Sequence, residues 1–353
     1  MKFLNALLIF IPITIAARIL QLNQGLIFLF ACLSIVPLAV IIGDATEQIS
    51  IYSGPKVGGL LNATMGNVPE LLIGIFAVKA GLFTLVLASM AGSIIGNVLL
   101  VLGLSIFLGG KKYKFQTFRK DIARSNFTLL FFAATSIIIP FAFFHSLADN
   151  PKIATHMQSF SLGIAIILLT LYILGLIYSL ITHRNIFTEH QEHMLAEEEI
   201  PKWSLKKSVV ILAVSTFFVA IASEMLVATV EFTAHQFGLS EVFIGVIIIP
   251  ILGNVAEHSS AMIMAVNNKV DISLEIAIGS SMQIALFVAP LLVVFSFFLG
   301  TPITYVYTLF QVVSIIIAIS MAIFVFQDGK THWLEGVQLV ACYVILAMAF
   351  FFL

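Results

Sequence analysis

Long apolar runs separated by short polar joints constrain this chain more than any other feature of its sequence. The runs are roughly 17 to 27 residues long, enough for a helix to cross a hydrocarbon core of about 30 Å. Strands in lipid would need a closed barrel and an alternating pattern, which these solid apolar runs lack. We therefore expect an all-α membrane protein with about 11 transmembrane helices.

The joints place the expected spans at residues 3–20, 26–50, 60–80, 82–108, 126–145, 157–182, 207–230, 243–266, 273–299, 302–326 and 333–353. Composition agrees, because 60% of the residues are hydrophobic and 10% are charged, unlike a soluble domain. The 17 basic and 18 acidic residues nearly cancel, which indicates no nucleic-acid partner. Cys32 and Cys342 both lie inside apolar runs, so they indicate neither a disulfide framework nor a thiolate metal site.

Basic residues predict the orientation of the spans. With the N-terminus in the cytoplasm, 14 lysines and arginines face the inside and three face the outside. The C-terminus then lies outside. The first run lacks a small-residue cleavage pattern before Gln21, so we expect a retained helix in place of a signal peptide. A short N-terminus without an organellar presequence points to a bacterial inner membrane. The inside set is Lys2, Lys56, Lys111, Lys112, Lys114, Arg119, Lys120, Arg124, Arg184, Lys202, Lys206, Lys207, Lys269 and Lys330; the outside set is Arg18, Lys79 and Lys152.

The sequence repeats itself with a shift of 187 positions, which aligns GNVPE at residues 66–70 with GNVAE at residues 253–257. The same shift aligns Gly92-Ser93 with Gly279-Ser280. The two copies run in opposite directions through the membrane, which is the inverted-repeat plan of many secondary transporters. We expect an N-terminal helix (1–25), repeat 1 (26–182), an acidic cytoplasmic linker (183–206) and repeat 2 (207–353), each repeat with five helices.

The linker between the repeats contains five glutamates, Glu189, Glu192, Glu197, Glu198 and Glu199. A solvated connector is one interpretation of this acidic run, and an element that attracts cations or regulates the inner mouth is the other.

Glu70 and Glu257 are the strongest functional signal. Each is central in its span, about 15 Å deep for Glu70, and a carboxylate there costs at least about 2.5 kcal/mol. The third and eighth spans contain no lysine or arginine that could compensate this charge. A metal ion or a proton is then the expected compensator, and a protonated carboxyl that only bonds helices together is the structural alternative. The duplication of the pair favours the first.

The residues around the two glutamates suit a hard cation, which takes about six to eight oxygen ligands. The amides of Asn67 and Asn254 either supply oxygens or stabilise the helix gaps, with a polar packing role as the alternative, while Gly66 and Gly253 loosen their helices. Pro69 frees the carbonyl of Met65 and Pro250 that of Val246, because proline has no amide donor. Broken helices of this kind expose backbone oxygens at the membrane centre.

Further polar side chains in the fourth and ninth spans are candidates to flank the site: Ser93, Asn97, Ser280, Ser281 and Gln283. Hydrogen bonding between helices is the alternative for each hydroxyl, and Gly92 and Gly96 have the GxxxG spacing of close helix packing. His258 either donates a hydrogen bond behind the site or faces water. Asp44, Glu47, Glu224 and Glu231 lie nearer span ends, where they either relay ions or are simply hydrated.

Three of these motifs resemble the signatures of CAX-type Ca²⁺/H⁺ exchangers: Ala45-Thr46-Glu47, the run from Gly58 to Glu70, and Gly253-Asn254-Val255-Ala256-Glu257-His258. The resemblance extends from the second helix to the eleventh. It implies that Glu70 and Glu257 bind Ca²⁺ and are protonated in turn, with Asn67 and Asn254 beside them. The sodium-driven branch of the superfamily usually has aspartates among its repeat acids, whereas this chain keeps glutamate in both copies, which favours protons over Na⁺.

The expected function is export of Ca²⁺ in exchange for H⁺ by alternating access, without a cofactor and with Ca²⁺ as the transported substrate. A Na⁺ or K⁺/H⁺ exchanger and a Na⁺/Ca²⁺ exchanger are the alternatives within transporters; a passive channel and an intramembrane enzyme are alternatives of other classes. The chain lacks an H-E-x-x-H zinc motif and a distinctive serine-protease pair, so we expect no enzyme. Ca²⁺, H⁺ and the bilayer are the expected partners, and association into a homo-oligomer stays open.

Overall fold

The computed structural model describes residues 6–146, 151–182 and 201–353, and almost all of them are helical. Residues 183–200 of the predicted linker (183–206), which hold its five glutamates and Arg184, lie outside the described residues, as does Lys2. The first half of the chain forms α2 (Phe10–Ile19), α3 (Gln24–Met65), α4 (Val68–Ala80), α5 (Phe83–Ile95), η1 (Gly96–Val101), α6 (Leu102–Lys112), β1 (Gln116–Thr117), α7 (Lys120–Ser146), α8 (Pro151–Ile177) and η2 (Tyr178–Thr182).

The second half forms α10 (Leu205–Phe237), α11 (Glu241–Phe243), η3 (Ile244–Ile248), α12 (Ile249–Gly253), α13 (Val255–Val266), α14 (Val270–Gln283), η4 (Ile284–Val288), α15 (Ala289–Phe298), α16 (Leu309–Val325), β2 (Lys330–Thr331) and α17 (Trp333–Phe351). The segments labelled η have the wider turns of a π-helix. The two short strands pair antiparallel, Gln116 opposite Thr331.

Seven helices of the described chain are long and apolar enough to cross a membrane, and two bent pairs pass the same test as broken spans. The bent pairs are Val57–Met65 with Val68–Ala80, at 43°, and Glu241–Gly253 with Val255–Val266, at 62°. α2 and α16 are shorter apolar helices. The chain is therefore an all-α membrane protein, as predicted, and the breaks in the third and eighth spans fall where the glycines and prolines predicted them.

Helix ends follow local chemistry. The Asn23 side chain accepts a hydrogen bond from the Gly25 amide and begins α3, and Ser204 does the same for Lys207 at the start of α10. Gly81 (φ +78°) and Gly238 (φ +64°) end α4 and α10 in the left-handed conformation that favours glycine. Within α3, Gly54 (φ +78°) interrupts the helical backbone before the third span begins. Polar residues and glycines at the joints thus divide the apolar sequence into separate helices.

One expected span is wrong at its beginning. The prediction began a helix at residue 302, but residues 301 to 308 form no regular secondary structure and α16 begins at Leu309. Pro302 and a run of β-branched residues disfavour helix here. The Ser296 and Ser161 hydroxyls accept hydrogen bonds from the amides of Ile303 and Tyr305, both at 2.9 Å, and so satisfy two buried amides of this non-helical segment.

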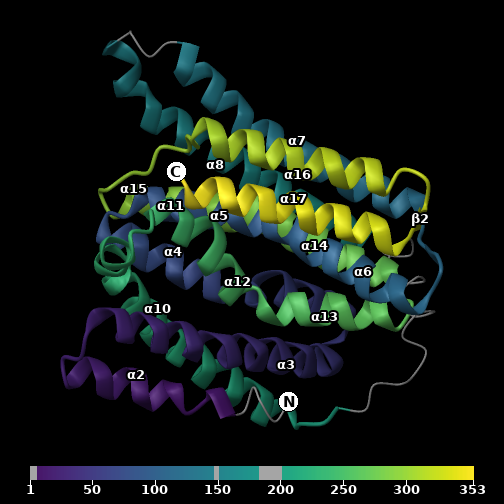
Figure 1. Ribbon diagram of the computed structural model, residues 1–353, viewed down its shortest axis with the longest axis horizontal. Helices are drawn as coiled ribbons and strands as arrows, with labels where there is room; N and C mark the ends of the chain where they lie inside the picture. Colours follow the sequence, from purple (N-terminus) through teal and green to yellow (C-terminus); the bar gives the residue numbers. More distant parts are fainter. Residues whose placement is uncertain (1–5, 147–150, 183–200) are drawn as a thin grey trace.

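Three layers organise the molecule (Figure 1). α2, α3 and α10 lie along one side, while α7, α16 and α17 lie along the opposite side. The broken helices α4, α12 and α13 lie between them with α5 and α14. The continuous run from Phe83 to Lys112 is the most buried of the long apolar helices in the described chain. The broken spans are therefore held in the interior, where a polar site can be kept away from lipid.

The loops at one end of the bundle bond to each other. The Gln116 side chain donates to the Ala265 carbonyl at 2.8 Å, and the Arg119 amide donates to Asp271 Oδ1 at 2.8 Å. Lys112 donates to the Val266 carbonyl at 3.2 Å. The basic loop after α6 is thus fixed to the joint between α13 and α14. These contacts place lysines of both repeats at the same end, as the orientation argument expects.

α6 and α17 pack backbone to backbone through two glycines. A Cβ built on Gly336 would lie 2.6 Å from the Gly103 carbonyl oxygen, and one built on Gly103 would lie 2.9 Å from the Gly336 carbonyl oxygen. We expect Gly336→Val to destabilise the fold by about 1–3 kcal/mol, because overpacking forces the helices apart. The measurement is the thermal unfolding midpoint of the purified protein in detergent.

The matched control is Gly175→Val in α8, where the added side chain is exposed and meets no other heavy atom of the described chain within 4 Å. Equal unfolding midpoints for the two variants would contradict the packing assigned to Gly336.

Candidate functional site: two carboxylates at the helix breaks

The two helix breaks have the same backbone geometry. Asn67 separates α3 from α4 with φ −97° and ψ 17°, and Asn254 separates α12 from α13 with φ −94° and ψ 13°. Each asparagine is followed three residues later by a glutamate in the first turn of the next half-helix. The free amides and the dipole at a helix N-terminus favour negative charge, so both carboxylates occupy a suitable place.

Each carboxylate lies against the glycine of the other break. A Cβ built on Gly253 would overlap Glu70 Oε1, and one built on Gly66 would lie 3.1 Å from Glu257 Oε1. Glu70 is 1% exposed, and the charges of the two glutamates interact. The glycines leave room for this crossed arrangement because they have no side chain. The duplicated motif therefore forms one site between the two halves of the chain.

The two asparagine amides are held by neighbouring side chains. The Asn67 Nδ2 group donates to Gln283 Oε1 at the end of α14. The Asn254 Nδ2 group donates to the Ser93 hydroxyl at 3.3 Å and to the Pro250 carbonyl at 3.0 Å. Because the nitrogens are occupied, the oxygens of both amides are left to face the site.

A second chain of contacts leads to Glu257. The Asn97 Nδ2 group donates to the Ser280 hydroxyl at 2.9 Å, and Ser280 hydrogen-bonds the Glu257 carboxyl. Asn97 Oδ1 lies 3.1 Å from His258 Nε2. Since the amide oxygen can only accept, this pairing assigns the proton to Nε2 and makes His258 the donor.

Five buried oxygens of the site have no hydrogen-bond partner among the described residues: Asn67 Oδ1, both Glu70 oxygens, Asn254 Oδ1 and Glu257 Oε2. An unsatisfied buried acceptor is costly, and a buried carboxylate more so. All five are hard oxygen donors, and each can be satisfied by a cation or, for the carboxylates, by a proton. Among the described residues no group of three or more His, Cys, Asp or Glu is placed to hold a metal ion. The donors at this site are the oxygens of two acids and two amides.

Most of the predicted flanking residues meet here. Gly66, Gly253, Ser93, Asn97, Ser280, Gln283 and His258 all belong to the contacts described above, and Met65 ends α3 beside the break. Ser281 does not belong to them. Its hydroxyl donates to the Ala277 carbonyl in its own helix at 2.9 Å, since one residue of helical rotation turns it away from the direction of Ser280.

The four outlying acids are not brought to the pair. Asp44, Glu47, Glu224 and Glu231 are exposed on α3 and α10, the two helices that pack together along one side of the molecule (Figure 1). Asp44 interacts with Lys202, and Glu231 interacts with Glu241. Their exposure favours the hydrated alternative over a direct place at the carboxylate pair.

One acid was missed by the sequence analysis. Glu275 lies half-buried on α14, five residues before Ser280, and interacts with Asp271 and Arg119. The 187-residue shift could have revealed it, because it aligns Glu275 with Ala88 and so places a carboxylate in one repeat where the other has a methyl group.

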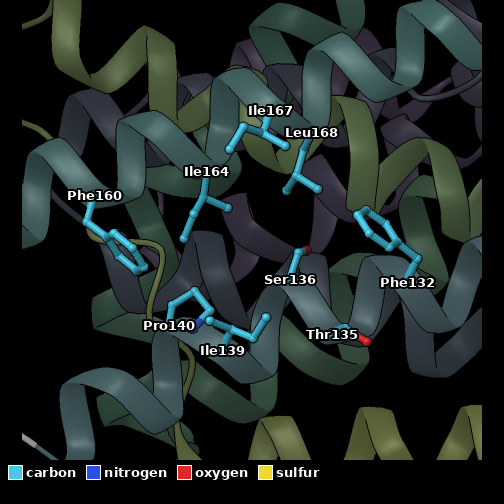
Figure 2. A pocket seen from close by; sticks show the side chains of 9 residues that line it. All are labelled: Phe132, Thr135, Ser136, Ile139, Pro140, Phe160, Ile164, Ile167 and Leu168. Carbon is cyan, nitrogen blue, oxygen red and sulfur yellow. The ribbon is translucent and has the colours of Figure 1, made fainter.

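An apolar cavity of about 170 Å³ lies between α7 and α8, and neither Glu70 nor Glu257 is among its lining residues (Figure 2). The hydroxyls at its wall, Thr135 and Ser136, donate to the carbonyls of Phe131 and Ala133 in their own helix. It is lined by Phe132, Thr135, Ser136, Ile139, Pro140, Phe160, Ile164, Ile167 and Leu168. Such a lining suits hydrocarbon, and it offers no charged ligand to a cation.

Comparison with known proteins places the fold. A family described as sodium/calcium exchanger protein matches residues 24–181 and again residues 207–352. The Ca²⁺/H⁺ antiporter ChaA of Bacillus subtilis is 45% identical over 97% of each chain. The Ca²⁺/H⁺ antiporter of Aphanothece halophytica is 41% identical over 98% of this chain and 95% of its own. The solved structure of native YfkE is 41% identical and superposes with a TM-score of 0.86 over 99% of this chain and 100% of its own.

Because Gly253 packs against the Glu70 carboxylate, Ca²⁺ binding should be sensitive to substitution of this glycine. We expect Gly253→Ala to weaken Ca²⁺ binding roughly 5- to 150-fold, because a methyl group there overlaps the Glu70 carboxylate and overpacking costs about 1–3 kcal/mol. Titration calorimetry of the purified protein with CaCl₂ measures the change.

The control is Gly96→Ala, a buried helical glycine near the site whose added Cβ would meet no other heavy atom of the described chain within 4 Å. Equal affinities for the parent and Gly253→Ala would show that the glutamate does not bind the cation from this position.

Proposed function

The chain belongs to the sodium/calcium exchanger family, and from that premise we propose that it exchanges Ca²⁺ for protons, with both ions competing for Glu70 and Glu257. Asn67 and Asn254 supply further oxygens to the cation. The observation that supports this assignment is the set of five buried oxygens without a partner in the described chain. Five unsatisfied acceptors at one buried place suit positive cargo.

The coupling follows from charge. Two carboxylates facing each other away from water are costly when empty, so the empty and doubly charged site is the least favourable state to move across the membrane. Ca²⁺ neutralises the pair from one side, and two protons neutralise it from the other. Because the same oxygens hold either load, one cargo must leave before the other enters, and the two fluxes are coupled.

The electrical cost is consistent with such an exchange. Moving one charge against 100 mV takes about 2.3 kcal/mol, so exporting Ca²⁺ takes about 4.6 kcal/mol and two entering protons return the same amount. With two carboxyls as the proton carriers, the exchange at one Ca²⁺ for two protons is electrically neutral.

Ca²⁺ and H⁺ are favoured over the alternative ions. Relatives that match nearly the whole chain are named Ca²⁺/H⁺ antiporters, and they are transporters by name, not enzymes. A Na⁺- or K⁺-driven exchanger is not favoured by these relatives. Both repeats have glutamate at the site, as in the CAX-type exchangers that the chain resembles, and this also favours protons over Na⁺.

We further infer that the chain is two inverted repeats preceded by one helix. The two segments that match the family, 24–181 and 207–352, nearly coincide with the predicted repeats 26–182 and 207–353. The similar backbone angles at Asn67 and Asn254 and the crossed glutamate–glycine contacts support the same division. In this proposal the N-terminus lies in the cytoplasm of a cell with the chain in its inner membrane, and the C-terminus lies outside.

The two-glutamate mechanism has a direct test. Proteoliposomes that contain the parent chain should accumulate ⁴⁵Ca²⁺ against its gradient when a pH gradient is imposed, with or without Na⁺. We expect Glu70→Gln and Glu257→Gln each to reduce this uptake at least ~100-fold, because one fixed carboxylate cannot neutralise Ca²⁺ in the membrane interior. Asp328→Asn, an equivalent change at an exposed loop acid, serves as the control.

Retained pH-driven uptake in either glutamine variant would refute the shared site. Uptake that requires a Na⁺ gradient would refute the proton assignment, and uptake that only dissipates a Ca²⁺ gradient would identify a channel.

The orientation is tested with fusions to the full chain. Alkaline phosphatase at the C-terminus should be active and green fluorescent protein there should be dark, because the C-terminus is expected outside. Green fluorescent protein fused after Lys202 should fluoresce, since this position is expected in the cytoplasm. The opposite pattern would invert the assignment of both ends.

A further inference from the structure

The two repeats do not pack alike around the site. The 187-residue shift relates α5 to α14, and it relates residues 244–253 to residues 57–66, the first part of the third span. α5 packs against residues 244–253, and these two segments touch through their backbones. A Cβ built on Gly245 would lie 2.6 Å from the Ala88 Cβ, and one built on Gly92 would lie 2.6 Å from the Val246 carbonyl carbon. The contact face of α5 is fully buried and consists of Leu85, Ala88, Ser89 and Gly92.

The equivalent pair, α14 and residues 57–66, has no such backbone contact. A Cβ built on Gly279, the counterpart of Gly92, would meet no heavy atom of the described chain within 4 Å outside its own helix. On the opposing segment Val57 is 48% exposed, whereas its counterpart Ile244 is 0% exposed. Asn62 is likewise exposed where its counterpart Ile249 is buried. The counterparts of the α5 face are all half-buried: Ile272, Glu275, Ile276 and Gly279.

One sequence unit thus occurs in two arrangements, closed in one repeat and open in the other. Inverted repeats exchange such arrangements when a transporter turns its site from one side to the other. In the proposed orientation, the open pair lies at the cytoplasmic end, because residues 57–66 precede the break at Asn67 in a helix that runs outward.

We propose that the α14 face of Ile272, Glu275, Ile276 and Gly279 is the cytoplasmic gate, which closes on residues 57–66, with Glu275 as the residue that opposes closure. The inference rests on the proposed exchange function and adds residues to it. In the closed arrangement Gly279 occupies the position that Gly92 has in the other pair, so the backbone of residues 57–66 packs directly against it. Glu275 takes the place of Ala88, whose methyl group packs against Gly245, and so must approach Gly58, the counterpart of Gly245.

The charge of Glu275 favours the open arrangement of the cytoplasmic gate over the closed one. A carboxylate moved from a half-exposed position into a backbone-to-backbone contact loses water, which disfavours the closed arrangement. Its charged neighbours are Asp271 in α14 and Arg119 just before α7, and the Arg119 amide already donates to Asp271 at 2.8 Å. Repeat 1 has no such charge at Ala88, so the two gates differ in how readily they close.

The test measures the gate apart from ion transport. Asn62→Cys is introduced into the full chain with Cys32→Ser and Cys342→Ser, and a membrane-impermeant thiol reagent is applied to the cytoplasmic face of vesicles. Labelling of this cysteine reports the open gate, because its counterpart Ile249 is 0% exposed in the closed pair. The labelling rate does not depend on which ion is carried, so failure of the proposed exchange leaves this readout intact.

Two substitutions should act in opposite directions. Glu275→Ala, which copies the closed repeat, should slow labelling at least ~3-fold as the population shifts to the closed gate. Gly279→Leu should leave labelling at least as fast as in the parent and slow ⁴⁵Ca²⁺/H⁺ exchange at least ~10-fold, because the closed pair has no room for the side chain. Gly175→Leu in α8 and Asp328→Ala are the matched controls, expected to change neither readout.

Gly279→Ala covers the case in which leucine prevents folding, since a single added carbon fits the open arrangement and should still slow exchange. Exchange at the parental rate in both Gly279 variants would overturn the proposal. So would slower labelling in Gly279→Leu, unchanged labelling in Glu275→Ala, or an unlabelled cysteine in the parent.

Discussion

The cost of two facing carboxylates away from water is the constraint on which the rest of the structure depends. Glu70 and Glu257 can approach only because each packs against a glycine of the opposite break. The breaks in turn need asparagines with non-helical backbone angles, and those asparagines are held by Gln283 and Ser93 from the neighbouring helices α14 and α5. Unsatisfied oxygens concentrated at one place favour positive cargo, and in the proposed exchange this preference is the physical basis of the coupling.

The surrounding helices hold the site in place and close one of the two paths that lead to it. α5 and the first half of the eighth span are in backbone contact, so the site is closed along that path. The related path along α14 is not packed, and Glu275 lies on it. An antiporter needs two arrangements of similar free energy, and two related units in different packings can provide them. A single charge that differs between the units is enough to bias one gate relative to the other.

Several features could be predicted from residue order. Unbroken apolar runs require helices in lipid, and Gly, Asn and Pro at residues 66–70 and 250–254 require breaks in them. Glu70 and Glu257 were found because uncompensated acids in such runs are rare and because the same motif occurs twice. The non-helical segment at 301–308 was not predicted, because the hydroxyls of Ser161 and Ser296 that satisfy two of its amides come from elsewhere in the chain.

The sequence by itself determined the class of the molecule, the positions of the helix breaks and the acids at them, because these depend on local composition and on a repeat that alignment reveals. Only the tertiary structure decided which neighbours those acids have. Ser280 reaches Glu257 while Ser281 bonds to its own helix, a difference set by one residue of helical rotation. Likewise, Gly92 and Gly279 are equivalent in sequence, and only packing makes one closed and the other open, because the contact partner of each comes from the other half of the chain.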